Sequence, residues 1–171
     1  NFAYEKAILK QFAFHHKSGE SMSDELLDKI KDSKNFQAAL AILRQVEFSL
    51  FDFMLHLKLY QGKEVQELLD SIREKTALIK PPSYNRFQHG FAHIFAGGYA
   101  AGYYSYKWAE VLSSDAFFAC LDDSGFNRQK AIGYKHHILY SGGKKPMSQL
   151  YLEWLSQSPK VQSLLKLYDI D

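Results

Sequence analysis

The amino-acid sequence predicts an all-α fold, a multi-helix bundle with almost no sheet. Apolar residues recur at three- and four-residue spacing, which places them on one side of a helix, and the alternation typical of strands is almost absent. Caps and prolines mark helix ends at frequent intervals. With 171 residues, 46% of them hydrophobic, the chain can bury a core of its own. We therefore expect a single α-helical domain over residues 1–171.

Four helices are expected in the first half, over residues 1–17, 24–31, 35–60 and 63–78. The first stops before Gly19, and Ser23 caps the second, whose first turn carries two acids. Gly62 follows the third helix. Pro81 and Pro82 close the fourth, because proline lacks the backbone donor and disfavours the helical conformation in the residue before it.

Four more helices are expected in the second half, over residues 99–121 and 128–140 and starting near Pro146 and Pro159. Gly125 and the Gly142-Gly143 pair end the first two. Proline suits the first turn of a helix, and Ser158 is the expected cap of the last one. The bundle then has about eight helical elements.

The charge balance argues against two classes of partner. The net charge is only +2, and no run of Lys and Arg forms the basic patch typical of nucleic-acid or membrane binding, so neither is expected. The longest uncharged run, residues 87–106, approaches the length of a membrane span but contains Gln88, two histidines and four glycines. The single cysteine, Cys120, forms no disulfide within the chain, which fits a reducing compartment.

Residues 87–106 are the most informative segment. Aromatic residues stand at every fourth position from Phe87 to Tyr103, which on a helix forms one stripe, and core packing alone explains such a stripe. The Gly97-Gly98 pair points the other way. Two glycines cost a helix about 1.5–2 kcal/mol relative to alanine, and they allow the backbone to approach another group closely.

Three tyrosines of this segment share one side of the predicted helix. At about 100° per residue, Tyr99, Tyr103 and Tyr106 point within about 60° of one another. Buried hydroxyls need partners, and a group of three is more typical of a polar cleft than of a dry core. On these patterns alone, core packing and a functional cleft both stay open.

His89 and His93 have the i, i+4 spacing with which two histidines on a helix bind one metal ion. Gly90 stands where an H-E-x-x-H zinc helix carries its catalytic glutamate. We therefore do not expect a metal site from this pair alone.

Residues 91–111 form a long motif, and matching runs accompany it along the chain. The motif reads Phe91-Ala92-His93-Ile94-Phe95-Ala96-Gly97-Gly98-Tyr99-Ala100-Ala101-Gly102-Tyr103-Tyr104-Ser105-Tyr106, followed by Trp108-Ala109-Glu110-Val111. The other runs are Asn35-Phe36-Gln37-Ala38-Ala39-Leu40, Leu43-Arg44-Gln45-Val46-Glu47, Leu50-Phe51-Asp52-Phe53, Asp115-Ala116-Phe117 and Phe126-Asn127-Arg128. Together they resemble the C-terminal region of the thimet oligopeptidase family of zinc metallopeptidases, with the closest likeness to its bacterial oligopeptidase A branch.

The resemblance implies the C-terminal part of a larger helical peptidase. Family members carry H-E-x-x-H on a helix and a glutamate ligand further on. This chain, which opens with Asn1-Phe2-Ala3-Tyr4-Glu5, is expected to begin just after that zinc-ligand segment. Zinc is then a cofactor of the complete enzyme, with no metal ligand in this chain and none bound by it alone. The implied partners are short peptides and the missing N-terminal, zinc-binding part of the same protein, and the implied location is the cytoplasm.

The resemblance also assigns roles within the motif. The residues implied are Tyr106 and Tyr99 as catalytic, and His93, Tyr103, Gly97 and Gly98 as substrate-binding. The catalytic hydroxyls would donate to the oxygen that gains negative charge during attack on an internal peptide bond of a short peptide. The glycine loop would move over the bound substrate. The alternative is a stand-alone helical module that binds a peptide with the same tyrosines and does not cut it.

Overall fold

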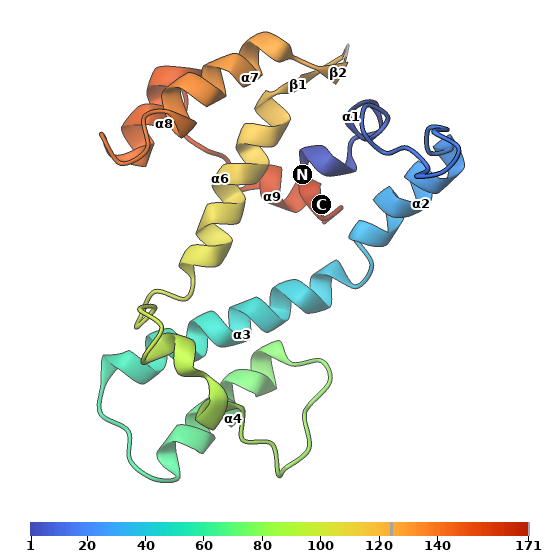
Figure 1. Cartoon of the computed structure of the whole chain (residues 1–171). Helices are drawn as coiled ribbons and strands as arrows, with labels where there is room; N and C mark the ends of the chain where they lie inside the picture. The colour runs from blue at the N-terminus through green and yellow to red at the C-terminus, as the bar shows by residue number, and fades with distance from the viewer. Residues whose placement is uncertain (124, 171) are drawn as a thin grey trace. The chain divides into compact units, whose positions relative to one another are not determined.

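Helices carry nearly all of the regular structure in the computed structural model, which describes residues 1–123 and 125–170 (Figure 1). The all-α prediction is confirmed, since the sheet in those residues is one pair of two-residue strands. The chain divides into a middle unit, Gln37–Ala109, and a terminal unit, Asn1–Phe36 with Glu110–Asp171. The single domain over residues 1–171 stays a prediction. No helix in the described part is long and apolar enough to cross a membrane.

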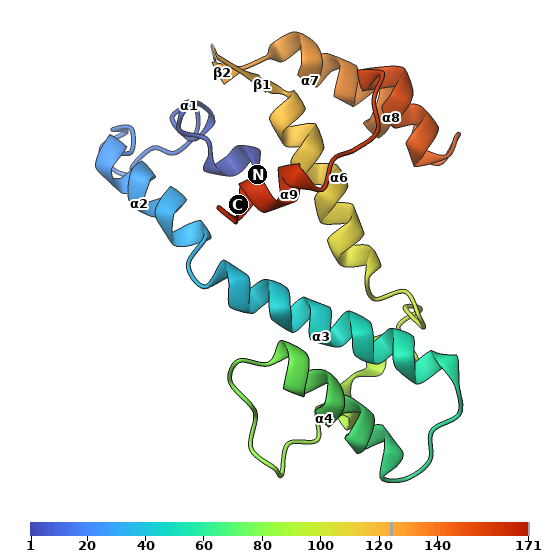
Figure 2. The same cartoon turned by 180° about the vertical axis from the view of Figure 1, so that it is seen from behind.

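The middle unit is built on α3 (Ala38–Leu57) and α4 (Glu64–Thr76), which lie against each other (Figures 1 and 2). Both helices lie within their predicted bounds. Their contact buries Phe51 of α3 together with Leu69 and Ile72 of α4. Each such side chain contributes about 1.5–3 kcal/mol when it leaves water, so the apolar spacing seen in the sequence does form this core.

A buried ion pair joins the same two helices. Arg73 of α4 donates from Nε to Glu47 Oε1 of α3 at 3.0 Å, and both side chains are at most 5% exposed. Arg44 donates to the same carboxylate oxygen at 2.9 Å from a half-exposed position. The second nitrogen of the Arg73 fork, Nη2, donates to Asn85 Oδ1 at 3.2 Å, and this oxygen also accepts from the Phe87 backbone N–H. The pair therefore also holds the start of the segment that follows.

The aromatic stripe divides into two parts. Phe87 begins the short helix α5 (Phe87–Gly90) and stacks on Phe48 with ring centroids 4.6 Å apart. Phe91 is buried in the core that Phe51 forms with α4. Phe95, by contrast, is 63% exposed beyond the single turn of η2 (Ala92–Ile94). Core packing thus explains Phe87 and Phe91, and Tyr103 also packs against this core, whereas Phe95 does not.

The helix predicted over residues 99–121 begins only at Ser105, where α6 (Ser105–Ala119) starts. Residues 99–104 form turns instead. Gly98 has φ +79°, and Ala101, which is not a glycine, has φ 52°. An α-helix of L-residues cannot run through such left-handed positions, so the prediction was wrong for this stretch.

In the terminal unit, 3-10 helix η1 (Phe2–Tyr4) and α1 (Lys6–Leu9) replace the predicted helix over residues 1–17. Beyond α1, side-chain bonds hold residues 15–20 in a local turn: the Ser18 N–H donates to His15 Nδ1 at 3.2 Å and the Ser18 hydroxyl donates to Glu20 at 3.1 Å. Such bonds offer the backbone an alternative to the helix.

The next helix of this unit, α2 (Asp24–Lys34), follows the predicted cap. Ser23 Oγ accepts from the Leu26 N–H at 3.3 Å. The cap prediction is confirmed, and the helix runs three residues beyond the predicted end at residue 31.

The rest of the terminal unit follows α6. The elements are β1 (Leu121–Asp122), β2 (Gly125–Phe126), α7 (Arg128–Tyr134), the π-helical turn η3 (Lys135–Leu139), α8 (Met147–Leu155) and α9 (Gln162–Leu167). The two strands pair antiparallel, with Leu121 opposite Phe126. Pro146 directly precedes α8, as predicted, whereas α9 begins after Val161 without a side-chain cap, so the cap predicted at Ser158 was wrong.

Candidate active site

Three of the four tyrosines of the motif, Tyr99, Tyr103 and Tyr106, meet in the middle unit. The rings of Tyr99 and Tyr106 stack with centroids 5.0 Å apart, and Tyr103 meets Tyr106 edge-on at 5.1 Å. We call these three residues the tyrosine cluster. The cluster was predicted from a shared helix face, but only Tyr106 lies on a helix, in the first turn of α6. The turns of residues 99–104 bring the other two rings to it.

The hydroxyls of the cluster differ in their partners. A hydrogen bond with the Tyr99 side chain, more than any other cause, raises the pKa of Tyr106 above the usual value of a tyrosine. Because of this raised pKa, Tyr106 keeps its proton at neutral pH. The side chain is 40% exposed, so a ligand can reach its hydroxyl. Tyr103 is half-buried, and burial raises its pKa. Its hydroxyl donates to Gln45 Oε1 of α3 at 3.2 Å.

His93 lies beside the cluster on η2 and is exposed. Its ring centroid is 6.3 Å from that of Tyr99 and 6.2 Å from that of Phe91. His89 belongs to α5, which ends at Gly90, so the two histidines do not share one continuous helix.

The residues present do not fit a zinc ion. Within residues 1–123 and 125–170, no three His, Cys, Asp or Glu side chains are grouped so that they could hold one metal ion.

Gly97 and Gly98 shape the turn between His93 and Tyr99. A Cβ at Gly97 would come 2.8 Å from both the Cα and the carbonyl oxygen of His93, closer than real Cβ contacts. Gly98 takes the left-handed φ that favours glycine. The Tyr99 N–H then donates to the His93 carbonyl at 3.2 Å. The glycine pair predicted to let backbones approach closely does so here within the chain itself.

Asp52 is a residue of this site that local sequence patterns did not identify. It lies on α3 with no exposed surface, and its two carboxylate oxygens accept from the backbone N–H groups of Ala101 and Tyr103, each at 2.9 Å. His56 Nδ1 lies 3.0 Å from Oδ1 and 2.8 Å from the Asp52 carbonyl oxygen. The one available signal was a carboxylate between two phenylalanines of an apolar helix, a position that needs buried partners.

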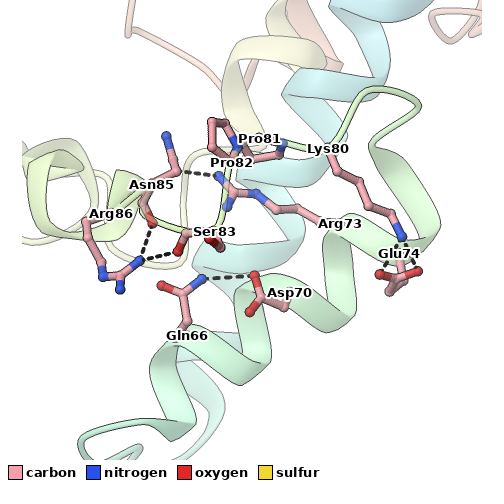
Figure 3. A pocket seen from close by; sticks show the side chains of 10 residues that line it. All are labelled: Gln66, Asp70, Arg73, Glu74, Lys80, Pro81, Pro82, Ser83, Asn85 and Arg86. Carbon is pink, nitrogen blue, oxygen red and sulfur yellow. Dashed lines mark hydrogen bonds and ion pairs between the residues drawn. The ribbon is translucent and has the colours of Figure 1, made fainter.

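A separate cavity of about 330 Å³ opens between α4 and the loop that leads to α5, as Figure 3 shows. Its charged side chains all have partners, among them Gln66 for Asp70 and Glu47 for Arg73. Lys80 Nζ contacts both carboxylate oxygens of Glu74 at 2.5 and 2.6 Å, and Arg86 donates to the carbonyls of Ser83 and Asn85. The cavity is not lined by the tyrosine cluster or by His93.

Cys120 is fully buried, and burial raises the pKa of its thiol. A thiol kept protonated is a poor nucleophile. This residue therefore adds no second reactive group to the site.

The helical fold and the tyrosine cluster are both consistent with the class of protein that the sequence motif indicated. The chain belongs to peptidase family M3, which residues 1–170 match. The family resemblance predicted from the motif is thereby confirmed.

Among individual relatives, "Oligopeptidase A" of Escherichia coli (strain K12) is 43% identical over 172 residues, which are 99% of this chain and 25% of the relative. Two Arabidopsis thaliana proteins are 38% identical over 173 residues, 97% of this chain. They are "Organellar oligopeptidase A, chloroplastic/mitochondrial" and "Probable cytosolic oligopeptidase A", of which the chain covers 22% and 24%. The chain thus spans about a quarter of the length of these relatives.

Proposed function

We propose that this chain is one part of a zinc metallo-oligopeptidase that hydrolyses internal bonds of short peptides, and that it supplies the tyrosine side of the substrate cleft. The observation that carries the proposal is the tyrosine cluster, in which an exposed phenol keeps its proton beside two others. Family membership supports the peptidase class. The proposal concerns a longer protein, because the relatives are about four times as long as the matched region.

In this proposal Tyr106 and Tyr99 are catalytic. When a peptide carbonyl is attacked, negative charge gathers on its oxygen, and a hydroxyl aimed at that oxygen stabilises the transition state more than the ground state. A donor for this purpose must be protonated at working pH and reachable from solvent. Tyr106 meets both requirements, and Tyr99 stacks against it.

His93, Tyr103 and the glycine turn would bind the peptide. His93 stands exposed next to Tyr99, and the two residues directly before Tyr99, Gly97 and Gly98, carry no side chains. Bare backbone of this kind can approach an extended peptide closely. Movement of this turn over the substrate belongs to the same proposal.

Zinc and its ligands belong, in this proposal, to the part of the protein outside this chain. The apolar side chains that α3 exposes fit contact with such a part, since Leu50, Phe53 and Leu57 are 41%, 45% and 68% exposed. The cytoplasmic location stays a prediction, because the names of the Arabidopsis relatives point to different compartments. The sequence that precedes Asn1 in the gene decides between this proposal and a stand-alone peptide-binding module: an H-E-x-x-H there supports the peptidase.

The chain of residues 1–171 alone is expected to be catalytically silent, because the resemblance places the metal ligands and the general base outside it. The test is incubation of the purified chain with zinc and a fluorogenic oligopeptide. Metal-dependent turnover that co-elutes with the chain and scales with its concentration would contradict this expectation.

Gly97→Ala in the full-length peptidase is expected to lower kcat/KM by roughly 10–100-fold, since displacement of a site by about 1 Å can cost 10² in rate. The new Cβ would collide with the His93 backbone and push the turn away from Tyr99. Gly90→Ala is the matched control, because a Cβ there meets nothing within 4 Å. Steady-state kinetics of both variants decide the matter, and equal effects would count against a special role for Gly97.

A further inference from the structure

We infer that Asp52 is a positioning residue of the active site: its buried carboxylate holds the loop of residues 99–104 in the shape that brings Tyr99 and Tyr103 to Tyr106. The inference rests on the proposed function of the tyrosine cluster. It adds a residue from a different helix, 49 and 51 positions away from the two residues whose backbone it binds.

The geometry of the carboxylate is the first argument. Oδ1 accepts the Ala101 N–H and Oδ2 accepts the Tyr103 N–H, each at 2.9 Å. One rigid group thus spans the loop, with Tyr99 just before the first contact and Tyr103 at the second. Hydrogen bonds to an ionised carboxylate are stronger than those between neutral groups.

The backbone that Asp52 binds is the second argument. Ala101 has φ 52°, a conformation that costs a residue other than glycine energy and persists only where its surroundings enforce it. The Ala101 N–H is bound by Asp52 directly at that position. A loop without this bond would return Ala101 to a more favourable conformation and carry the neighbouring rings with it.

The orientation of Asp52 is the third argument. Nδ1 of His56, one helical turn further along α3, faces two acceptors, the Asp52 carboxylate at 3.0 Å and the Asp52 carbonyl at 2.8 Å. Nδ1 therefore carries a hydrogen and donates it. The carboxylate is held from one side by His56 and from the other by the loop.

The first test is Asp52→Asn in the full-length peptidase, with kcat and KM measured on a fluorogenic oligopeptide. The amide cannot accept at both positions, so one loop N–H loses its acceptor. We expect kcat to fall roughly 10–100-fold, as a misplaced site does. In a Tyr106→Phe background the same change is expected to cost less than in the parent, because the loop then has no Tyr106 hydroxyl to align with, while its effect on Tyr99 remains.

Asp115→Asn is the matched control. Asp115 is 5% exposed in the terminal unit and accepts from the Tyr151 and Ser163 hydroxyls, each at 2.5 Å. It is a buried carboxylate with two partners, as Asp52 is, but it makes no contact with the loop of residues 99–104. We expect this variant to unfold at lower denaturant concentration while its kcat stays within about twofold of the parent.

His56→Leu provides a second variant for the case that Asp52→Asn does not fold. It leaves the carboxylate and both loop contacts in place and removes the contacts of His56 Nδ1 with the Asp52 carboxylate and carbonyl, together with the ring contact to Phe95. We expect a kcat loss of roughly 3–10-fold that is again smaller in the Tyr106→Phe background.

Three results overturn the inference. The first is a normal kcat in Asp52→Asn. The second is a double variant whose loss of kcat equals the product of the losses in its two single variants. Where Asp52→Asn does not fold, the third is a normal kcat in His56→Leu. A normal kcat in Tyr106→Phe alone would contradict the proposed function of the cluster. The Asp52 and His56 variants test the further inference, so the two failures can be told apart.

Discussion

Replacing Tyr106 by phenylalanine in the full-length peptidase is expected to lower kcat by about 10²–10³, the usual loss when one oxyanion donor is removed. The ring stays, so its stacking on Tyr99 and its edge contact with Tyr103 should survive. KM should change much less, because the lost hydrogen bond acts chiefly in the transition state. Steady-state kinetics on a fluorogenic oligopeptide measure both quantities.

Tyr104→Phe is the matched control for this experiment. Tyr104 neighbours the cluster in the sequence and is 48% exposed, but its ring packs on Phe53. Loss of its hydroxyl should leave kcat within about twofold of the parent. Tyr103→Phe should act mainly on KM if that hydroxyl only holds substrate. A Tyr106→Phe enzyme with near-normal kcat would return Tyr106 to a packing role.

Arg73→Leu is expected to destabilise the full-length protein by about 3–5 kcal/mol, the cost of removing one partner from a buried ion pair. Glu47, 1% exposed, would keep its charge with only the half-exposed Arg44 beside it. Asn85 would also lose the donor that fixes it at the start of α5. The shift in the denaturation midpoint of the transition that includes this region measures the effect.

Arg44→Leu serves as the comparison, because it removes a donor from the same Glu47 oxygen at the surface. We expect it to cost about 1 kcal/mol, the sum of a weak exposed ion pair and the contact of its guanidinium with the Phe48 ring. A double variant in which Glu47 and Arg73 both become leucine should recover part of the loss, since no unpaired charge remains. Equal effects of Arg44→Leu and Arg73→Leu would show that burial of the pair does not matter.

Local sequence rules predicted those parts of the fold that local physics determines. The cap at Ser23 and the helices α3 and α4 follow from side-chain chemistry and apolar spacing within a few residues. The helix predicted over residues 1–17 ends at Leu9, and bonds among His15, Ser18 and Glu20 compete with a helix at the far end of that range. Such competition between neighbours is hard to weigh from spacing alone.

The candidate site shows where that kind of reasoning stops. Tyr99, Tyr103 and Tyr106 were singled out, and they do meet, but the predicted helix that would have aligned them is absent from residues 99–104. The groups that organise the loop, Asp52 and Gln45, lie about 50 residues or more away in the sequence. No periodicity within a window of one helix can reveal a contact of that range.

The single bond between Tyr103 and Gln45 has a consequence for which peptide groups this tyrosine can recognise. A phenol has one proton to give, and Gln45 Oε1 already takes it at 3.2 Å. A peptide carbonyl that sought this proton would exchange one hydrogen bond for another, with a net gain well below the 0.5–1.5 kcal/mol of a typical new bond. The oxygen lone pairs of Tyr103 remain able to accept. In the proposed function, Tyr103 would therefore accept from a peptide N–H rather than donate to a peptide C=O.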